Sequence, residues 1–298
     1  MTTTPLRMGL AGTGHWADVA HASAIGDSTQ WSLAAVWGRD AGKAGELAAR
    51  HGAPASGDDF DAFLEQVDAV TFALPPMVQS ELAIRAMEAG KHVAMEKPIS
   101  LDTASADRIV ATAERTGVAG ITLFTTLYDP RIRAIVADVE AGRRWTGGAG
   151  LWLGSALGAE NPFNTPWRGV HGGLWDVGPH AISVLRTTLG PITSVHGLRG
   201  AADLVHLVLG HEDGRTSTTT LTLNAPDAAD GFATLLWGEH GKLEVPVDDV
   251  DFRAAFVTAY DELAELIRTG ERAHPCDLQF GAEVVGVLVA AEASLESA

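Results

Sequence analysis

The stretch that decides the fold is LRMGLAGTGHWA, residues 6–17. Its first half is a short apolar run that predicts a β-strand, and a helical pattern follows from about residue 15 to residue 25. Between them stands G-x-G-x-x-A, in which Gly12 allows a tight turn, Gly14 admits a pyrophosphate and Ala17 lets the helix pack closely. Such a helix start presents N–H groups to phosphate. The stretch predicts a dinucleotide-binding loop, the alternative being a glycine-rich turn without a ligand.

The same alternation continues through residue 122. Short apolar runs lie at 32–37, 68–74, 92–95 and 118–123, and helical stretches lie at 40–50, 77–89 and 101–116. This pattern is typical of a parallel sheet flanked by helices. We therefore predict an α/β Rossmann domain with a doubly wound parallel sheet over residues 1–122.

From residue 123 the pattern changes. Helical patterns at 129–142 and 181–189 flank a loop-like stretch at 159–173, and strand signals dominate from 193 to 247. Two helices follow, at about 253–268 and 278–295. Several consecutive strands without intervening helices imply a large, mostly antiparallel sheet. We predict a second, α+β domain over residues 123–298, for substrate binding and oligomerisation.

Composition excludes several classes of protein. The 298 residues include 21 Lys and Arg against 38 Asp and Glu, a net charge of −17, which argues against nucleic-acid partners and anionic membranes. A single cysteine, Cys276, forms neither an internal disulfide nor a thiolate metal site, and the histidines show no metal-ligand spacing, so we expect no metal. The absence of a long apolar run or a signal-peptide pattern predicts a cytoplasmic protein.

The residues after the second predicted strand bear on the cofactor. In this fold an Asp or Glu there hydrogen-bonds the ribose hydroxyls and favours NAD. Here Gly38 stands near that place, and Arg39 can pair with a 2′-phosphate. We expect NADP, with NAD possible. The alternative is that Arg39 is solvated and Asp40 caps the following helix.

Two further segments carry chemistry: GKHVAMEKP at 90–98 and GGLWDVGPH at 172–180. With the glycine-rich loop, they resemble the glucose-fructose oxidoreductase, inositol dehydrogenase and rhizopine-catabolism (Gfo/Idh/MocA) family over nearly the whole chain. The resemblance implies that Lys97, Asp176 and His180 are catalytic. The chemistry agrees, because a lysine at a strand's carboxyl end can stabilise charge on a substrate oxygen. If Asp176 and His180 share a helix face, the carboxylate orients a histidine base; alone, such a pair is more often a structural contact.

The resemblance also implies binding residues. Trp167 and Arg168 border the substrate pocket together with Asp176, although Arg168 could instead form a rim salt bridge. Trp16 could instead fill the core. The predicted cofactor contacts are Gly12, Thr13, Gly14, His15, Trp16, Gly38, Arg39, Leu74, Pro75, Glu96 and Lys97.

This chain departs from the family pattern at two places. Relatives often carry an Arg where residues 124–128 read FTTLY, so a contact made by that Arg is missing near Thr126. His171 replaces one of the usual glycines, and it either reaches the site or faces solvent. These departures put a standard sugar pocket in doubt.

These observations predict an NAD(P)-dependent oxidoreductase, NADP favoured, that interconverts a secondary alcohol and a ketone on a sugar, polyol or related small molecule. One alternative is a same-family reductase of an imine, tetrapyrrole or aromatic diol, and another is a non-catalytic dinucleotide-binding regulator. The family suggests a homodimer or homotetramer packed through the second sheet. Four apolar strand residues could line that face or an internal core: Leu207, Leu209, Leu221 and Leu223.

Overall fold

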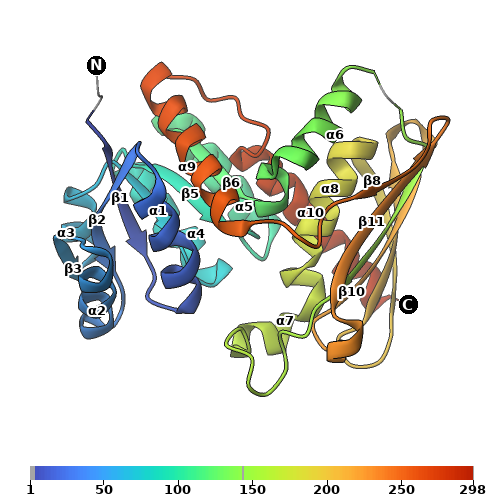
Figure 1. Ribbon diagram of the computed structural model, residues 1–298, viewed down its shortest axis with the longest axis horizontal. Coiled ribbons are helices and arrows are strands. Elements are labelled where there is room, and N and C mark those ends of the chain that lie inside the picture. The colour runs from blue at the N-terminus through green and yellow to red at the C-terminus, as the bar shows by residue number, and fades with distance from the viewer. Residues whose placement is uncertain (1–3, 143, 298) are drawn as a thin grey trace. The chain divides into compact units, whose positions relative to one another are not determined.

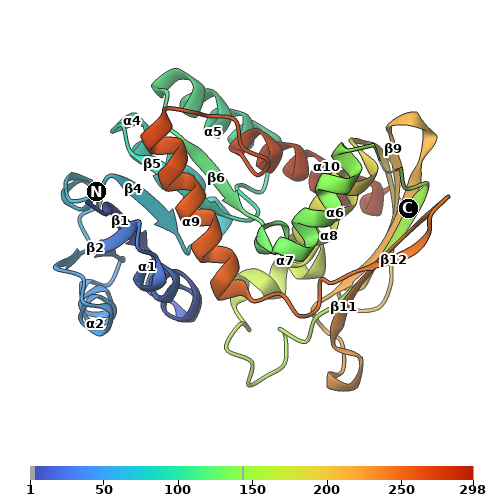
Figure 2. The same cartoon turned by 45° about the horizontal axis from the view of Figure 1, so that its top comes forward.

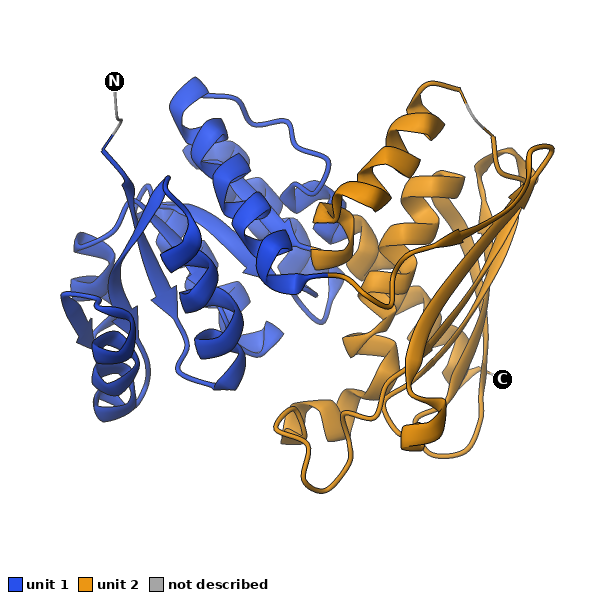
Figure 3. Cartoon of the chain, viewed as in Figure 1, with its two compact units in different colours: residues 1–123, 251–282 blue, residues 124–250, 283–298 orange. Residues whose placement is uncertain are grey.

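The computed structural model describes residues 4–142 and 144–297 and divides into two compact units (Figure 3). The first comprises Met1–Leu123 and Asp251–Ala282, and the second comprises Phe124–Val250 and Glu283–Ala298. This division differs from the expected 1–122 and 123–298, because the chain returns to the first unit after residue 250. Helix α9 (Phe252–Thr269) packs there on α1 (Ser23–Asp27) and on the π-helix η1 (Ala17–Ala22).

The first unit is built on a six-stranded, wholly parallel sheet in the order β3-β2-β1-β4-β5-β6 (Figure 1). Its strands are β1 (Leu6–Ala11), β2 (Trp31–Trp37), β3 (Ala55–Gly57), β4 (Ala69–Phe72), β5 (His92–Glu96) and β6 (Gly120–Leu123). The doubly wound parallel sheet predicted from the sequence is confirmed. Strand β3 was not predicted, since three residues carry no readable alternation.

Helices cover both faces of this sheet, with α1 and α9 on one face and α4 and α5 on the other (Figures 1 and 2). The remaining bounds are α2 (Ala41–His51), α3 (Phe60–Glu65), α4 (Pro76–Glu88) and α5 (Thr103–Thr116). Aspartates begin several of them; Asp40, for example, accepts hydrogen bonds from Gly42 N and Lys43 N. Neither α3 nor the π-helical turn of η1 was predicted.

The second unit is built on a six-stranded sheet in the order β12-β11-β7-β10-β9-β8. Strands β7 and β10 are parallel and every other neighbouring pair is antiparallel, which confirms the predicted mostly antiparallel sheet. The strands are β7 (Gly147–Leu153), β8 (Ile192–Arg199), β9 (Val205–His211), β10 (Thr216–Thr222), β11 (Gly231–Gly238) and β12 (Gly241–Val245).

One face of this sheet is covered by helices (Figure 2). They are α6 (Pro130–Glu140), α7 (Pro166–Asp176), α8 (Gly178–Leu189) and the greater part of α10 (Leu278–Glu296), with short 3-10 turns at Thr125–Tyr128, Glu212–Gly214 and Asp227–Ala229. The four leucines left open above are at most 1% exposed, so they form the internal core. The prediction of a loop over 159–173 is wrong from Pro166 onward. Thr165 accepts from Arg168 N and Pro166 occupies the first helical position, a favoured helix start that the surrounding glycines obscured.

Helix α10 is apolar through most of its length. By length and composition alone it could cross a membrane, a test that the core helix of a soluble protein also passes, and 44% of its apolar window is buried within the structure. Val285 and Leu288 are 0% exposed. Packing thus accounts for part of its apolar composition.

Helix α7 approaches β10 so closely that only glycine fits at the contact. A Cβ at Gly173 would lie 2.7 Å from the backbone N and Cα of Thr222, whereas a Cβ at Gly169 would meet nothing within 4 Å. Gly172 departs from helical geometry with a φ of 59°. The glycine pair therefore sets how α7 enters the motif at 172–180.

Gly173→Ala is expected to lower the free energy of unfolding by about 1–3 kcal/mol, because backbone atoms cannot yield as a side chain can. Gly169→Ala, in the same helix, is the matched control and should leave stability unchanged or raise it by up to about 1 kcal/mol. Urea unfolding of both variants measures the difference. Equal effects of the two substitutions would contradict the close approach.

Candidate functional site

The sequence-predicted nucleotide loop lies at the point where the strand order of the first sheet reverses. Gly12, Gly38 and Ala73 follow directly on β1, β2 and β4, whose last residues pair in register. Gly12 N donates to the carbonyl of Trp37, and Ala73 N donates to the carbonyl of Ala11, both at 2.9 Å. Ligands of open α/β sheets bind outside the carboxyl ends of strands at such a switch point.

The glycines of the loop fit a dinucleotide. Gly12 has a φ of 133°, and a Cβ there would lie 2.5 Å from the carbonyl oxygen of Ala73, so the turn requires glycine. Gly14 is exposed, and a Cβ there would meet nothing within 4 Å. This open space, directly before the first helical residues, is where a pyrophosphate would approach the backbone. Beside the loop, His15 is exposed, Leu74 is half-buried and Pro75 is exposed at the start of α4.

The end of β2 offers no acid for the ribose. A Cβ at Gly38 would lie 2.6 Å from Cγ2 of Thr13, so a larger residue at 38 would displace that side chain. Asp40 caps α2, as one of the two interpretations of this segment held. Arg39 is exposed beside them, and its role toward a 2′-phosphate stays a prediction.

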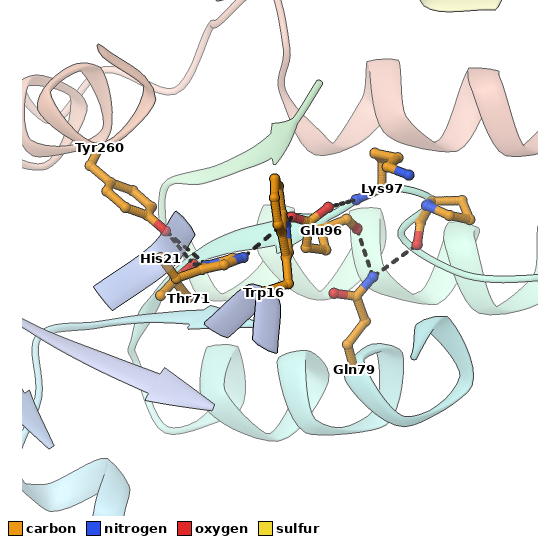
Figure 4. Close-up of polar contacts among 8 residues, drawn as sticks. Trp16, His21, Thr71, Gln79, Glu96, Lys97 and Tyr260 are labelled. Atoms are coloured by element: carbon orange, nitrogen blue, oxygen red, sulfur yellow. Dashed lines mark hydrogen bonds and ion pairs between the residues drawn. The ribbon is translucent and has the colours of Figure 1, made fainter. Parts of the chain in front are cut away.

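Glu96 is the last residue of β5, and Lys97 follows it, before a cis peptide bond to Pro98 (Figure 4). Glu96 is 8% exposed; its Oε1 accepts from Trp16 Nε1 at 2.7 Å and its Oε2 from Lys97 N at 3.1 Å. Gln79 Nε2 donates to the carbonyls of Glu96 and Pro98, at 2.6 and 2.8 Å, and so holds the main chain on both sides of Lys97. Trp16 is therefore a hydrogen-bonding partner of this motif as well as a packing residue.

The carboxyl group of Glu96 stays charged although it is buried. Burial by itself would raise its pKa, but the hydrogen bond and charge of His21, then Lys97 and Trp16, outweigh burial and hold the pKa below its usual value of 4.5. Sequence analysis did not single out His21, which is 0% exposed.

In the second unit, Asp176 pairs with Arg168. Arg168 Nε donates to Asp176 Oδ2 at 2.8 Å, and the two side chains are only 22% and 10% exposed. Arg168 also donates to the carbonyl of Phe163 at 3.3 Å and lies over the rings of Phe163 and Trp167. Of the two alternatives for Arg168, the structure shows the salt bridge. Its partner, Asp176, is a predicted catalytic residue.

Asp176 and His180 do not share one helix. Helix α7 ends at Asp176 and α8 begins at Gly178, so the condition that both stand on one continuous helix is not met. The His180 ring stacks on Trp152, with centroids 5.9 Å apart and planes at 5°, and Trp152 stacks in turn on Phe232. Trp152 Nε1 donates to Thr234 Oγ1 at 3.2 Å. Strands β7 and β11 therefore orient the imidazole.

Aromatic side chains also surround His171, which replaces a family glycine. Its ring centroid lies 5.5 Å from that of Trp167 and 6.4 Å from that of Trp175, and Trp175 Nε1 donates to Glu292 at 3.2 Å. Burial lowers the pKa of His171, although the charge of Glu292 opposes this shift. His171 packs against the helix instead of facing solvent alone.

Asp203, which sequence analysis did not single out, ties Gly173 of α7 to the second sheet. Its Oδ2 accepts from Gly173 N at 2.9 Å and from Leu223 N at 2.7 Å, and its Oδ1 accepts from Thr222 Oγ1 at 2.6 Å. An isolated aspartate in a turn gives no signal of such a role in the sequence.

The structure thus groups the predicted residues into two sets. The first unit brings together the glycine-rich loop, Trp16, Glu96 and Lys97, and the second brings together Trp167, Arg168 and Asp176 with His180 close behind in the chain. Within residues 4–142 and 144–297, no three His, Cys, Asp or Glu side chains form a group that could hold a metal ion.

Comparison with known proteins finds relatives that match part of this chain. The chain is 31% identical to 4-carboxy-2-hydroxymuconate-6-semialdehyde dehydrogenase of Sphingobium sp. over 139 residues, 46% of this chain and 44% of that protein. It is 30% identical to the scyllo-inositol 2-dehydrogenase (NADP(+)) of Bacillus subtilis over 132 residues, 44% of this chain and 40% of that protein. The chain thus matches less than half the length of each.

The fold is shared over nearly the whole chain. Apo scyllo-inositol dehydrogenase from Lactobacillus casei superposes with a TM-score of 0.87 at 19% identity, covering 100% of this chain and 98% of that one. The family model described as an oxidoreductase family with an NAD-binding Rossmann fold matches residues 6–124. These findings support the resemblance drawn from the motifs, and residues 6–124 match the Gfo/Idh/MocA oxidoreductase family.

Proposed function

We propose that the protein is an NADP-dependent oxidoreductase that transfers a hydride between the cofactor and a secondary alcohol or ketone of a sugar, polyol or related small molecule. The observation that carries the proposal is a hydrogen-bonded link between the loop around Gly14 and Lys97. The Glu96 carboxylate accepts from Trp16, which follows the loop, and from the backbone N of Lys97. A bare glycine-rich turn needs no such link to a lysine at the neighbouring strand end. The single cysteine, Cys276, is 1% exposed, which suits a cytoplasmic enzyme.

Bound nicotinamide supplies the hydride acceptor or donor. In the oxidative direction the substrate carbon loses a hydride and its hydroxyl loses a proton. His180 takes that proton. Stacking on Trp152 holds its ring in one plane. The Lys97 ammonium stabilises the negative charge that develops on the oxygen. Asp176, held charged by Arg168, contacts substrate hydroxyls and favours the protonated form of His180.

One competing substrate class has support of its own. The rings of Trp167, His171 and Trp175 gather on α7, and the Sphingobium relative is named for a substrate that is not a sugar. An aromatic or unsaturated substrate would pack on such rings. Turnover assays with polyols and with aromatic diols, run in parallel, separate the two classes. A regulator would bind dinucleotide and oxidise neither.

Replacing Lys97 by Met should lower kcat by about 100- to 1,000-fold, the range for losing one donor that stabilises a developing oxyanion. Lys91→Met is the matched control, since Lys91 precedes the opposite end of β5 and donates to the carbonyl of Val67. It should retain wild-type kcat. Steady-state kinetics with NADP measure both variants, and wild-type kcat in Lys97→Met would overturn the catalytic assignment.

Arg39→Ala should weaken NADPH binding by about 10- to 100-fold, because it removes a charged hydrogen bond to the 2′-phosphate, and should leave NADH binding unchanged. Fluorescence titration with the two cofactors measures the effect. Arg115→Ala is the control: this exposed arginine pairs with Glu88 at the end of α5, and neither cofactor should respond to its loss. Equal binding of NADH and NADPH by the wild type would contradict the NADP preference.

We also propose a homodimer, or a homotetramer built from it, packed through the open face of the second sheet. Leu151 is 50% exposed, Leu198 63%, Val208 48% and Trp237 38%, and the strand register places all four on that face. Exposed apolar residues gathered on one face of a sheet are a feature of interaction surfaces.

The double variant Leu151→Arg, Val208→Arg should convert the assembly to monomers, since it buries charge at the interface. Val170→Arg, a change at an apolar residue that is 78% exposed on α7, should leave the assembly intact. Light scattering of the eluting protein reads the mass. A monomeric wild type would refute the proposal.

A further inference from the structure

A buried polar cluster lies beside the candidate cofactor loop and joins four elements of the first unit (Figure 4). Its members are His21 of η1, Thr71 of β4, Glu96 of β5 and Tyr260 of α9. His21, Thr71 and Tyr260 are 0% exposed. None of these three takes part in the proposed hydride transfer, so their buried polar atoms call for another explanation.

The His21 ring is bonded on both sides. Its Nδ1 lies 3.0 Å from Thr71 Oγ1 and 2.9 Å from the Tyr260 hydroxyl, and these two oxygens are 3.0 Å apart. Its Nε2 lies 3.3 Å from Glu96 Oε1. A carboxylate only accepts hydrogen bonds, so Nε2 carries a proton and donates it. Burial raises the pKa of Tyr260 well above 10, so its hydroxyl stays protonated, and it lies within hydrogen-bond distance of Nδ1.

The Glu96 carboxylate connects His21 to two parts of the candidate site. The oxygen that accepts from His21 also accepts from Trp16 Nε1, and the other oxygen accepts from Lys97 N. The carboxylate therefore joins the helix that follows the glycine-rich loop to the backbone of the lysine. A shift of Glu96 would move both.

We propose that His21 is a positioning residue: by donating from Nε2, with Tyr260 and Thr71 behind it, His21 holds Glu96 charged and in one orientation, and so fixes Trp16 and Lys97. This inference rests on the proposed function. It adds to it a buried residue, remote from the reacting atoms, on which cofactor binding and hydride transfer both depend.

The local backbone favours this arrangement over a generic buried histidine. Residues Ala17–Ala22 form a π-helix, and the wider turn changes the angular position of every side chain that follows. His21 lies inside this turn and faces the strand ends. Phe256 of α9 packs edge-on against both His21 and Trp16, with centroids 4.7 and 5.8 Å away, and so confines the His21 ring on that side.

Two substitutions test whether the effect of His21 comes from its N–H donor or from the volume of its ring. His21→Met removes the donor at similar volume, and His21→Gln retains an N–H near the place of Nε2. His211→Met is the matched control, because His211 of the second unit is 3% exposed and is likewise bonded through both nitrogens, to Gly190 O and Ser217 Oγ. All three variants lose a buried histidine. Only His21→Met removes the donor to Glu96.

The first readout needs neither cofactor nor turnover. The indole N–H resonance of Trp16, assigned with Trp16→Phe, reports the charge of the carboxylate to which it donates. The titratable groups that face Glu96 are His21 and Lys97, with Tyr260 behind His21. In His21→Met, the carboxyl group loses a donor and its pKa should rise, so the resonance should shift in a titration run from about pH 5 to pH 9. In the wild type, His21→Gln and His211→Met it should stay constant.

The second readout is kinetic. His21→Met should weaken NADPH binding and lower kcat, each by about tenfold, because both the loop and Lys97 lose their fixed position. His21→Gln should recover most of both, and substrate KM should change little. Should His21→Met fail to fold, Tyr260→Phe, which removes only the supporting hydroxyl, should produce the same changes at smaller size.

A constant Trp16 resonance in His21→Met, or kinetics equal to those of His211→Met, would overturn the proposal and leave His21 a structural residue. Unaltered resonance and kinetics in Tyr260→Phe, when His21→Met does not fold, would overturn it equally. A wild type that binds no dinucleotide would instead refute the proposed function. In that case the Trp16 titration still decides whether His21 holds Glu96 charged.

Discussion

The buried carboxylate of Glu96 is the constraint on which the first unit depends. Removing a charge from water costs several kcal/mol unless donors replace the solvent. Here the donors come from three segments: Trp16 at the loop, His21 in the π turn and the backbone N of Lys97. Because each donor must reach the same two oxygens, the relative positions of η1 and β5 are narrowly limited. The same geometry that satisfies the charge aligns the nucleotide loop with the lysine.

In the second unit, the main constraint is the close approach of α7 to β10. A Cβ at Gly173 would strike the backbone of Thr222, and Asp203 closes the contact from the side by accepting from Gly173 N and Leu223 N. In the motif at 172–180, packing therefore explains the glycines of the first half, and the proposed catalysis explains Asp176 and His180 in the second half. Asp176 follows Gly173 by three residues, and Arg168, earlier in the same helix, donates to its carboxylate.

Local signals predicted most of the fold. Strand β1 begins and ends where its apolar run does, and the β-α alternation gave the parallel sheet, because burial on both faces leaves an uninterrupted apolar signature. The short β3 and α3 and the π turn left no comparable pattern. At the site, the motifs identified Gly12, Gly14 and the Glu-Lys-Pro segment, each defined by a local turn. The surroundings of Glu96 could not be predicted, since a buried histidine and an exposed one look alike in a single helical stretch.

The partner that completes the cluster lies far along the chain. Tyr260 is 239 residues from His21, and its backbone carbonyl accepts from Trp31 Nε1, 229 residues away. The family match ends at residue 124, before this helix begins. A Rossmann unit cut at that boundary would expose the apolar side of α1 and leave His21 Nδ1 without the tyrosine hydroxyl. Helix α9 therefore belongs to the cofactor unit by energetics as well as by contact, and the unit can reach its final polar arrangement only after the chain has passed through the second sheet and returned.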